Sequence, residues 1–257
     1  MTRGLEQVWQ RVGGLLRDIG ELTILAGQSL AWLPRRPWRA QLFLQQMEFV
    51  GAGSLFIVFL TGTFSGLVLA LQLIEGFGRF KAESLVGSTI AIALCRELGP
   101  VLTALIVAGR AASAMATEIG TMRVTEQIDA LKTMAVSPIH YLVVPRLVAG
   151  VLMLPLLTML FIVLGMLASY YVAVEVMRID PGSYMRNINR YLSPRDISVG
   201  VVKSVVFGAT ISLIACHRGL AASGGARGVG AATTAAVVSS FIAIFVLDYV
   251  ITAAAFQ

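Results

Sequence analysis

The sequence contains little charge and few of the residue types that enzymes use as nucleophiles or metal ligands. Only 13% of its 257 residues are Asp, Glu, Lys or Arg, whereas 57% are hydrophobic, and the mean hydropathy is +0.81. An ordinary soluble domain is far less apolar and carries about 25% charged residues. The composition therefore excludes a soluble domain of the usual kind and predicts an integral membrane protein.

Recognisable catalytic and metal-binding patterns are also missing. The two cysteines, Cys95 and Cys216, show neither a CxxC motif nor metal-ligand spacing, so we interpret them as small buried apolar residues. His140 and His217 are isolated, and the sequence has no GxxxxGK(S/T), GxSxG or HExxH motif. We therefore expect no catalytic residue, metal ion or cofactor in this chain, and no unaided hydrolysis of a nucleotide or a peptide.

Long apolar segments dominate what is present. About 20 helical residues cross the roughly 30 Å of hydrocarbon in a bilayer. Five segments are long enough and carry almost no charge: 49–74, 84–109, 147–174, 197–217 and 228–247. We predict an all-α membrane protein in which residues 49–257 form one domain of five transmembrane helices.

The N-terminal arm has a different pattern. Apolar residues recur at helical spacing over residues 5–26, but Arg17, Asp18 and Glu21 lie where a signal peptide needs an uncharged core. This pattern predicts an amphipathic elbow helix in the membrane interface, followed by a turn and a second short interfacial stretch. We therefore assign residues 1–48 to N-terminal amphipathic interfacial helices; packing of this helix on another part of the protein is the alternative.

The basic residues indicate an orientation. More than half of the 20 Lys and Arg residues lie on the cytoplasmic side if the N-terminus is inside, which favours a cytoplasmic N-terminus and a C-terminus on the outer side. The net charge of +6 suits a protein that touches anionic headgroups. The arginines are too scattered to predict binding of nucleic acid.

Charges lie near the middle of two of the predicted spans. Arg96 is 14 residues from Arg110 and Lys203 is 14 residues from His217, so both lie about 21 Å from the inner ends of their helices. A charge at the centre of a membrane helix costs about 2.5–3.5 kcal/mol on insertion scales and usually faces a bundle interior or a wet cavity. These residues therefore predict a polar lining.

The partners of these charges follow from helix geometry. Glu97 points about 100° away from its neighbour Arg96, so we predict that Glu97 pairs with Lys203 instead. Pro100 removes a backbone hydrogen bond and should free the carbonyl of Arg96 toward a cavity. An inter-helix ion pair that only fixes the packing remains possible. Asp248, near the outer end of its span, is explained adequately by snorkelling or a local hydrogen bond.

The number of spans bears on assembly. Gly62 and Gly66 form a GxxxG motif that predicts a close helix contact, within one chain or between two. Five spans without a visible internal repeat argue against an inverted-repeat transporter. Because five helices enclose little space, a large cavity would arise most simply on a two-fold axis in a homodimer.

The loop between the second and third spans predicts a short amphipathic helix. Residues 125–136 read TEQIDALKTMAV: Thr125 is a candidate N-cap, and Pro138 should end the helix. Val124, Ile128 and Leu131 fall on one face. Such a helix would rest on the membrane surface, or would fit a groove in a soluble motor protein as the coupling helices of ABC transporters do.

Residues 97–150, which begin ELGPVLTALIVAGR, resemble the signature region of the MlaE (YrbE) permease family. The similarity continues through LPLLT at 154–158 and KSVVFG at 203–208. The resemblance implies the permease subunit of an ABC transporter in the bacterial inner membrane. Such a permease moves phospholipids between that membrane and a periplasmic MCE-domain protein (MlaD-like), and so contributes to outer-membrane lipid asymmetry. It further implies a homodimer with separate ABC ATPase subunits (MlaF-like), which would bind ATP and Mg, and a STAS-domain protein (MlaB-like).

The family pattern also implies roles for particular residues. The residues that match its coupling helix, at about 117–137, are Glu118, Arg123, Glu126, Asp129 and Lys132. The residues expected to contact lipid are Arg96, Glu97 and Lys203, with Leu73, Ile74 and Phe77 at the outer mouth. Ser137 stands where the family more often has Asp. An ion-coupled secondary carrier and an ABC permease for another hydrophobic solute remain the rival interpretations.

Overall fold

The computed structural model describes residues 2–35 and 39–256, and no strand occurs among them. Five helical segments are long and apolar enough to cross a membrane: Ala40–Gly78, Glu83–Val124, Ile139–Val176, Pro194–Leu220 and Gly225–Ala255. The predicted all-α membrane fold with five spans is therefore confirmed.

Helices follow one another along the whole described chain. The α-helices are α1 (Thr2–Trp32), α2 (Ala40–Gly78), α3 (Val86–Ala93), α4 (Gly99–Val107), α5 (Ser113–Val124), α6 (Gln127–Thr133), α7 (Val144–Tyr170), α8 (Pro181–Tyr191), α9 (Pro194–Leu220) and α10 (Gly225–Phe256). Five short turns of other helix types join them: the 3-10 turn η1 (Glu83–Leu85) and the π turns η2 (Leu94–Leu98), η3 (Ala108–Ala112), η4 (Ile139–Val143) and η5 (Tyr171–Val176).

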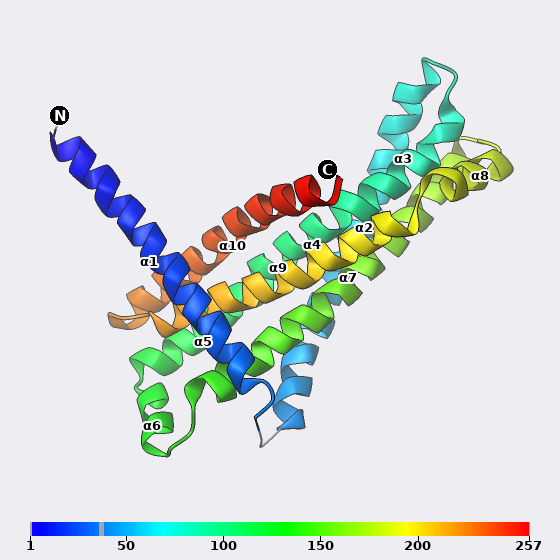
Figure 1. Ribbon diagram of the computed structural model, residues 1–257. Coiled ribbons are helices and arrows are strands. Elements are labelled where there is room, and N and C mark those ends of the chain that lie inside the picture. The colour runs from blue at the N-terminus through cyan, green and yellow to red at the C-terminus, as the bar shows by residue number, and fades with distance from the viewer. Residues whose placement is uncertain (1, 36–38, 257) are drawn as a thin grey trace.

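The spans form an elongated bundle with α6 at one end and α8 at the other, called here the α6 end and the α8 end (Figure 1). Within the bundle, α2 packs along α7, α7 along α9, and α10 along both α9 and α5. The second span is not one uniform helix, because η2 and η3 divide it into α3, α4 and α5. It therefore has two wide turns at which its path can bend.

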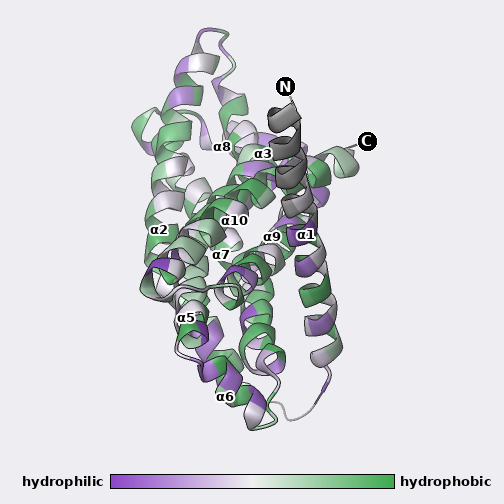
Figure 2. Cartoon of the chain, turned by 90° about the vertical axis from the view of Figure 1, so that its left-hand side faces the viewer, coloured by the Kyte–Doolittle hydropathy of each residue, from purple (hydrophilic) through white to green (hydrophobic). Residues whose placement is uncertain are grey.

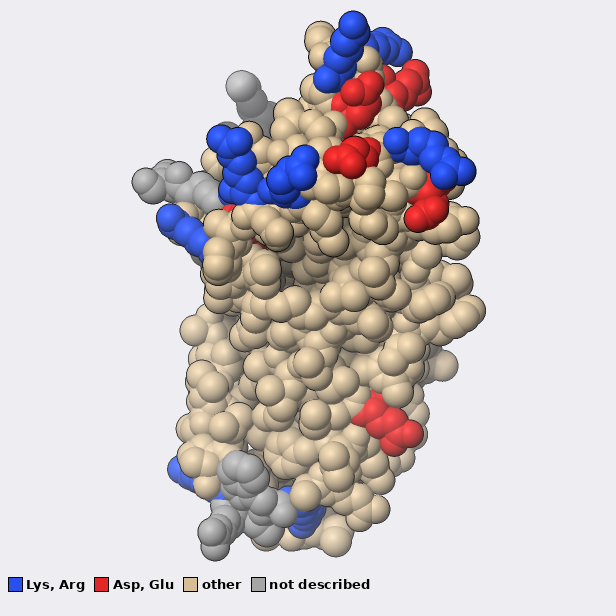
Figure 3. Space-filling view, turned by 90° about the vertical axis from the view of Figure 1, so that its right-hand side faces the viewer, with Lys and Arg blue, Asp and Glu red and all other residues tan. Residues whose placement is uncertain are grey.

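The surface of the bundle is apolar where a bilayer would surround it. Residues with high hydropathy cover the middle of the spans, and hydrophilic residues gather around α6 (Figure 2). On the face shown in Figure 3, charged side chains cluster at the top, above a broad surface of other residues. Large apolar side chains are exposed on α2 and α10, including Phe56 (68%) and Tyr249 (75%). Such an exposed apolar surface fits lipid or a partner protein and not water.

The N-terminal arm forms a helix that packs partly on the rest of the protein, which was the alternative considered for it. α1 contacts α9, η4 and α7, and its Leu25 and Ser29 are buried, so its second half packs on the protein. The expected second interfacial stretch is not separate, because α2 runs without a break from Ala40 into the first span. Residues 40–48 contain no Gly or Pro and are mostly good helix formers, so nothing stops the helix there.

Glycines bring α2 and α7 into backbone contact. A Cβ placed on Gly66 would collide with the backbone of Gly165, and one on Gly62 would lie 3.0 Å from the carbonyl oxygen of Phe161. The GxxxG motif of the first span therefore serves a contact within the chain.

We expect Gly66→Ala to destabilise the protein by about 1–3 kcal/mol, because the added methyl group meets backbone atoms that cannot rotate away. The matched control is Gly76→Ala on the same helix, where a Cβ meets nothing within 4 Å. That change should be neutral or slightly stabilising. Thermal unfolding of both variants in detergent checks the prediction, and equal midpoints would contradict it.

Candidate functional site

A π turn in the second span creates the first part of the site. Pro100 has no N–H to donate to the carbonyl of Arg96, and the backbone widens into η2, with the N–H of Gly99 donating to Leu94. The freed carbonyl of Arg96 accepts a hydrogen bond from Lys203 Nζ at 3.0 Å. The freed carbonyl was predicted, but it points at Lys203 and not into a cavity.

Lys203 lies at the centre of an ionic cluster. Its Nζ lies 2.5 Å from Glu97 Oε2 and 2.7 Å from Asp248 Oδ1, and the residue is completely buried. An ammonium group has three donors, and all three are used by Arg96, Glu97 and Asp248. The predicted pairing of Glu97 with Lys203 is confirmed. The assignment of Asp248 to snorkelling or a local hydrogen bond is wrong, because Asp248 is the second counter-ion of Lys203.

A second ion pair completes this ionic cluster. Arg96 Nε donates to Asp196 Oδ1 at 2.7 Å, and the Asp196 side chain is 1% exposed. Asp196 also forms the capping box of α9 with Ser193. The Ser-x-x-Asp spacing at the start of a helix is typical of a capping box and could have identified Asp196 as a capping residue. That spacing does not predict its contact with Arg96.

The members of the cluster differ in accessibility. The side chains of Arg96 and Glu97 are 34% and 39% exposed, and that of Asp248 is 21% exposed, whereas Lys203 is sealed. A molecule beside this protomer can therefore reach Arg96 and the two carboxylates but not Lys203. Lys203 holds three elements together, and the geometry gives no support to its expected direct contact with lipid.

The three residues expected at the outer mouth lie on the last turns of α2, at the α8 end. Leu73 and Phe77 are partly buried, and Ile74 is 7% exposed and lines a cavity of about 430 Å³ beside α8. The structure thus places these residues at the mouth of the bundle. Their contact with lipid remains a prediction.

The coupling segment is built differently from the expectation. Thr125 does not cap α6, because its hydroxyl donates to the carbonyl of Thr121 in the preceding helix at 2.8 Å. Glu126 occupies the N-cap position with φ +59°, and this left-handed residue turns the chain sharply from α5 into α6. Pro138 does not end the helix either. α6 already ends at Thr133, and Ala135, the residue after the C-cap Met134, has φ +58°. A left-handed residue at this position is a common way to end a helix.

One face of α6 is covered by the protein itself. Ile128 is 2% exposed and belongs to a buried cluster with Ile119, Leu142 and Cys216. The opposite face is open, and Met134, which directly follows the helix, is 72% exposed. The helix is therefore seated firmly on the bundle and presents its outer face to whatever lies beyond the α6 end.

Charged residues connect this helix to its surroundings. Asp129 lies 3.0 Å from Arg123 and 2.9 Å from Lys132. The hydrogen bond from Lys132 lowers the pKa of the Asp129 carboxyl below its ordinary value, and the charge of Arg123 adds to this. Glu118 Oε2 forms a 2.6 Å ion pair with Arg146, which is 3% exposed, and so joins α5 to α7. All five expected coupling residues thus lie at or near the α6 end.

Comparison with known proteins identifies the family. The profile described as "Permease MlaE" matches residues 43–254. The chain belongs to the MlaE permease family. It is 42% identical over 245 residues to a probable ABC transporter permease protein of Rickettsia bellii, covering 95% of each chain. It is also 36% identical over 248 residues to the intermembrane phospholipid transport system permease protein MlaE of Haemophilus influenzae, covering 96% of this chain and 95% of the relative.

A plant relative extends the family beyond bacteria. The chloroplastic protein TRIGALACTOSYLDIACYLGLYCEROL 1 of Arabidopsis thaliana is 41% identical over 234 residues, which cover 91% of this chain and 67% of the relative. The resemblance noted from the sequence is confirmed. This chain is a multi-pass ABC transporter permease, and as such a non-catalytic transporter subunit.

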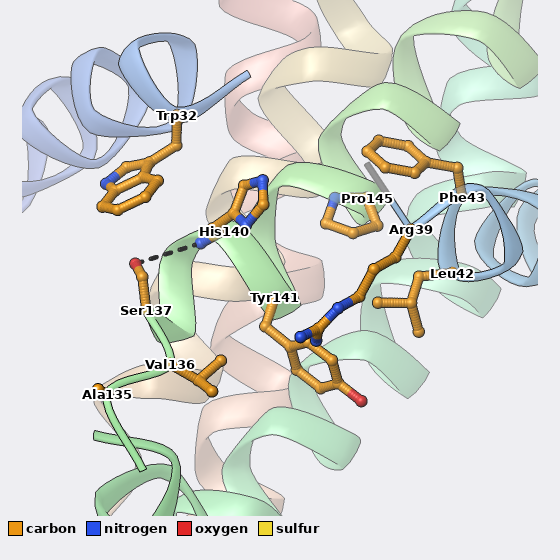
Figure 4. Close-up of a pocket in the computed structure, with 10 residues that line it drawn as sticks. All are labelled: Trp32, Arg39, Leu42, Phe43, Ala135, Val136, Ser137, His140, Tyr141 and Pro145. Atoms are coloured by element: carbon orange, nitrogen blue, oxygen red, sulfur yellow. Dashed lines mark hydrogen bonds between the residues drawn. The ribbon is translucent and has the colours of Figure 1, made fainter. Parts of the chain in front are cut away.

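In this MlaE permease, sequence reasoning missed a hollow beside the coupling segment. A cavity of about 290 Å³ opens where α1 ends, α2 begins and η4 follows α6 (Figure 4). The Arg39 guanidinium lies 5.1 Å from the centre of the Tyr141 ring, and the rings of Trp32 and His140 are 5.5 Å apart. Basic and aromatic side chains of this kind are typical of the headgroup level of a membrane. The segment between α6 and η4, which includes Ala135, Val136 and Ser137, therefore lines this cavity.

A further polar group joins α1 to α9. Ligand-type atoms of Asp18, Glu21 and His217 lie within 4.8 Å of one another. Both carboxylates are already paired, Asp18 with Arg218 at 2.8 Å and Glu21 with Arg17 at 2.9 Å. Two guanidinium groups already balance the charge of these carboxylates, so this group is better suited to fastening α1 to the bundle.

Proposed function

We propose that this MlaE permease moves phospholipids between the bacterial inner membrane and a periplasmic MCE-domain protein, and so contributes to outer-membrane lipid asymmetry. The observation that carries this proposal is the ionic cluster. Accessible Arg96 and Glu97 side chains interrupt a predominantly apolar span. The name of the Haemophilus influenzae relative, a phospholipid transport system permease, supports phospholipid as the cargo.

In this proposal the cluster holds the lipid headgroup. Arg96 is the accessible cation, and a guanidinium suits the oxygens of a phosphate. Asp196 fixes the guanidinium from behind, while Lys203 keeps Glu97 and Asp248 in place. The acyl chains would rest on exposed apolar side chains of α2 and α10, such as Phe64 (59%) and Ile242 (61%).

Energy would come from separate subunits. We place the α6 end in the cytoplasm, with the N-terminus inside and the C-terminus periplasmic, where the open face of α6 meets an ABC ATPase that carries ATP and Mg. Two permeases would form a homodimer with two such ATPases, and a STAS-domain protein would bind the ATPase. Closure of the ATPase pair would push both α6 helices, and a lower lipid affinity in one state would make the cycle a pump.

Arg96→Ala should reduce the phospholipid that co-purifies with the complex by roughly tenfold or more, because a hydrogen bond to a charged group is lost. Arg96→Lys should keep part of it, since the charge remains but the planar fork does not. Lipid extraction and mass spectrometry of the purified complex give the measurement. Arg79→Ala, which removes an exposed arginine paired with Glu75 at the end of α2, is the matched control.

Reconstitution of the complex in proteoliposomes tests the function itself. ATP-dependent transfer of phospholipid to or from a periplasmic MCE-domain protein is expected. Transfer that needs no ATPase and follows the membrane potential would instead indicate an ion-coupled carrier. ATP-dependent movement of another hydrophobic solute without phospholipid would indicate a permease of different specificity.

A further inference from the structure

The ionic cluster contains more acid than base. Its carboxylates are Glu97, Asp196 and Asp248, and its cations are Arg96 and Lys203. Arg96 and Asp196 neutralise each other at 2.7 Å. One ammonium group, that of Lys203, therefore faces two carboxylates, and this part of the cluster carries one excess negative charge if every group is ionised.

No other cation of the described structure is placed to balance that charge. On α10 and η2, and on the elements packed against them, the remaining charged residues are Arg110, Glu118, Arg123, Arg146, Arg195, His217, Arg218 and Arg227. Arg110 donates to the carbonyl of Phe49 and to Ser54. Arg195 donates to the carbonyl of Ala255, seven residues and thus about 10 Å beyond Asp248. The others lie on turns closer to the α6 end.

Lys203 cannot neutralise both carboxylates, because an ammonium group carries only one positive charge, and its three donors are already used. Two carboxylates that share one site do not both ionise readily, and a low-dielectric setting strengthens their repulsion. A proton on one of them removes the excess charge without disturbing the contacts with Lys203. The hydroxyl of Thr252, which lies 3.1 Å from Glu97 Oε1, can donate to a carboxylate or accept from a protonated carboxyl.

We propose that Glu97 and Asp248 together bind one proton beside Lys203 at neutral pH. The two carboxylates and their cation come from three elements, since Glu97 lies on η2, Lys203 on α9 and Asp248 on α10. A movement of α10 away from α9 would separate Asp248 from Lys203 and change the proton affinity of the pair. The proposal concerns the protonation of this permease and does not depend on the identity of its cargo.

Infrared spectroscopy of the permease–ATPase complex tests the proposal directly. The complex is placed in phosphatidylglycerol nanodiscs, so that no lipid amine can neutralise the cluster, and spectra at pH 7 are compared in H2O and D2O. The wild type should show the carbonyl stretch of one protonated carboxyl. Asp248→Asn and Glu97→Gln should each lose this band, because either change leaves Lys203 with a single carboxylate.

The matched control is Glu175→Gln, which removes an exposed carboxylate from η5 and should leave the band unchanged. Co-purification of the ATPase shows that each variant is folded. Absence of the band in the wild type at pH 7 would overturn the proposal. So would a band that persists in both Asp248→Asn and Glu97→Gln.

Discussion

Replacing Lys203 with methionine is expected to destabilise this permease by about 3–5 kcal/mol, the usual cost of breaking a buried ion pair by removing one partner. The side chain is completely buried and bonds to two carboxylates and one backbone carbonyl. Without it, Glu97 and Asp248 face each other with no cation, and η2, α9 and α10 lose their common contact. Thermal unfolding in detergent and the yield of folded protein measure the effect.

Charge-compensated variants separate electrostatics from packing. Combining Lys203→Met with Glu97→Gln and Asp248→Asn replaces all three ionisable side chains at nearly constant volume, and should restore most of the stability. Lys132→Met is the matched control, because that lysine is 57% exposed and its ion pair is with exposed Asp129. It should cost less than about 1 kcal/mol. If Lys203→Met were no more harmful than Lys132→Met, Lys203 would not be the centre of the fold at this depth.

Charge reversal at Asp129 is expected to abolish the stimulation of ATP hydrolysis by lipid while leaving the membrane part folded. Asp129 holds both Arg123 and Lys132, so Asp129→Lys brings together three cations, one at the end of α5 and two on α6. These pairs are largely exposed and contribute little to stability. The loss should therefore appear in coupling and not in the unfolding midpoint. ATPase assays of the reconstituted complex, with and without lipid, measure it.

Glu75→Lys provides the comparison for this variant. Glu75 also forms an exposed ion pair, with Arg79, but it lies on the last turns of α2, away from α6. Its reversal should leave coupling intact. Full lipid-stimulated ATPase activity in Asp129→Lys would show that α6 does not transmit the movement.

Helix geometry explains what the sequence could predict. The number of spans, the shared depth of Arg96 and Lys203, and the pairing of Glu97 with Lys203 all follow from length and from a rise of 1.5 Å per residue. These properties belong to single helices, so they can be read from one segment at a time. Family resemblance then supplied the transporter class.

What escaped prediction depends on how helices meet. Asp248 was overlooked as a partner of Lys203 because its position along its own span does not reveal that α10 packs on α9. The contact of Asp196 with Arg96 arises from the folded path of the second span past the start of α9. The turn at Glu126 needed a left-handed residue, which composition does not indicate for a glutamate, so Thr125 was a reasonable but incorrect cap.

The glycine contact between α2 and α7 has a practical use. Where two backbones touch, no layer of flexible side chains remains to absorb sliding. Spin labels or fluorophores attached to the outward surfaces of these two helices should therefore keep a constant separation throughout an ATP cycle. The distance between these two labels would serve as an internal reference, and displacements of α10 or α6 could be measured relative to it in the same sample.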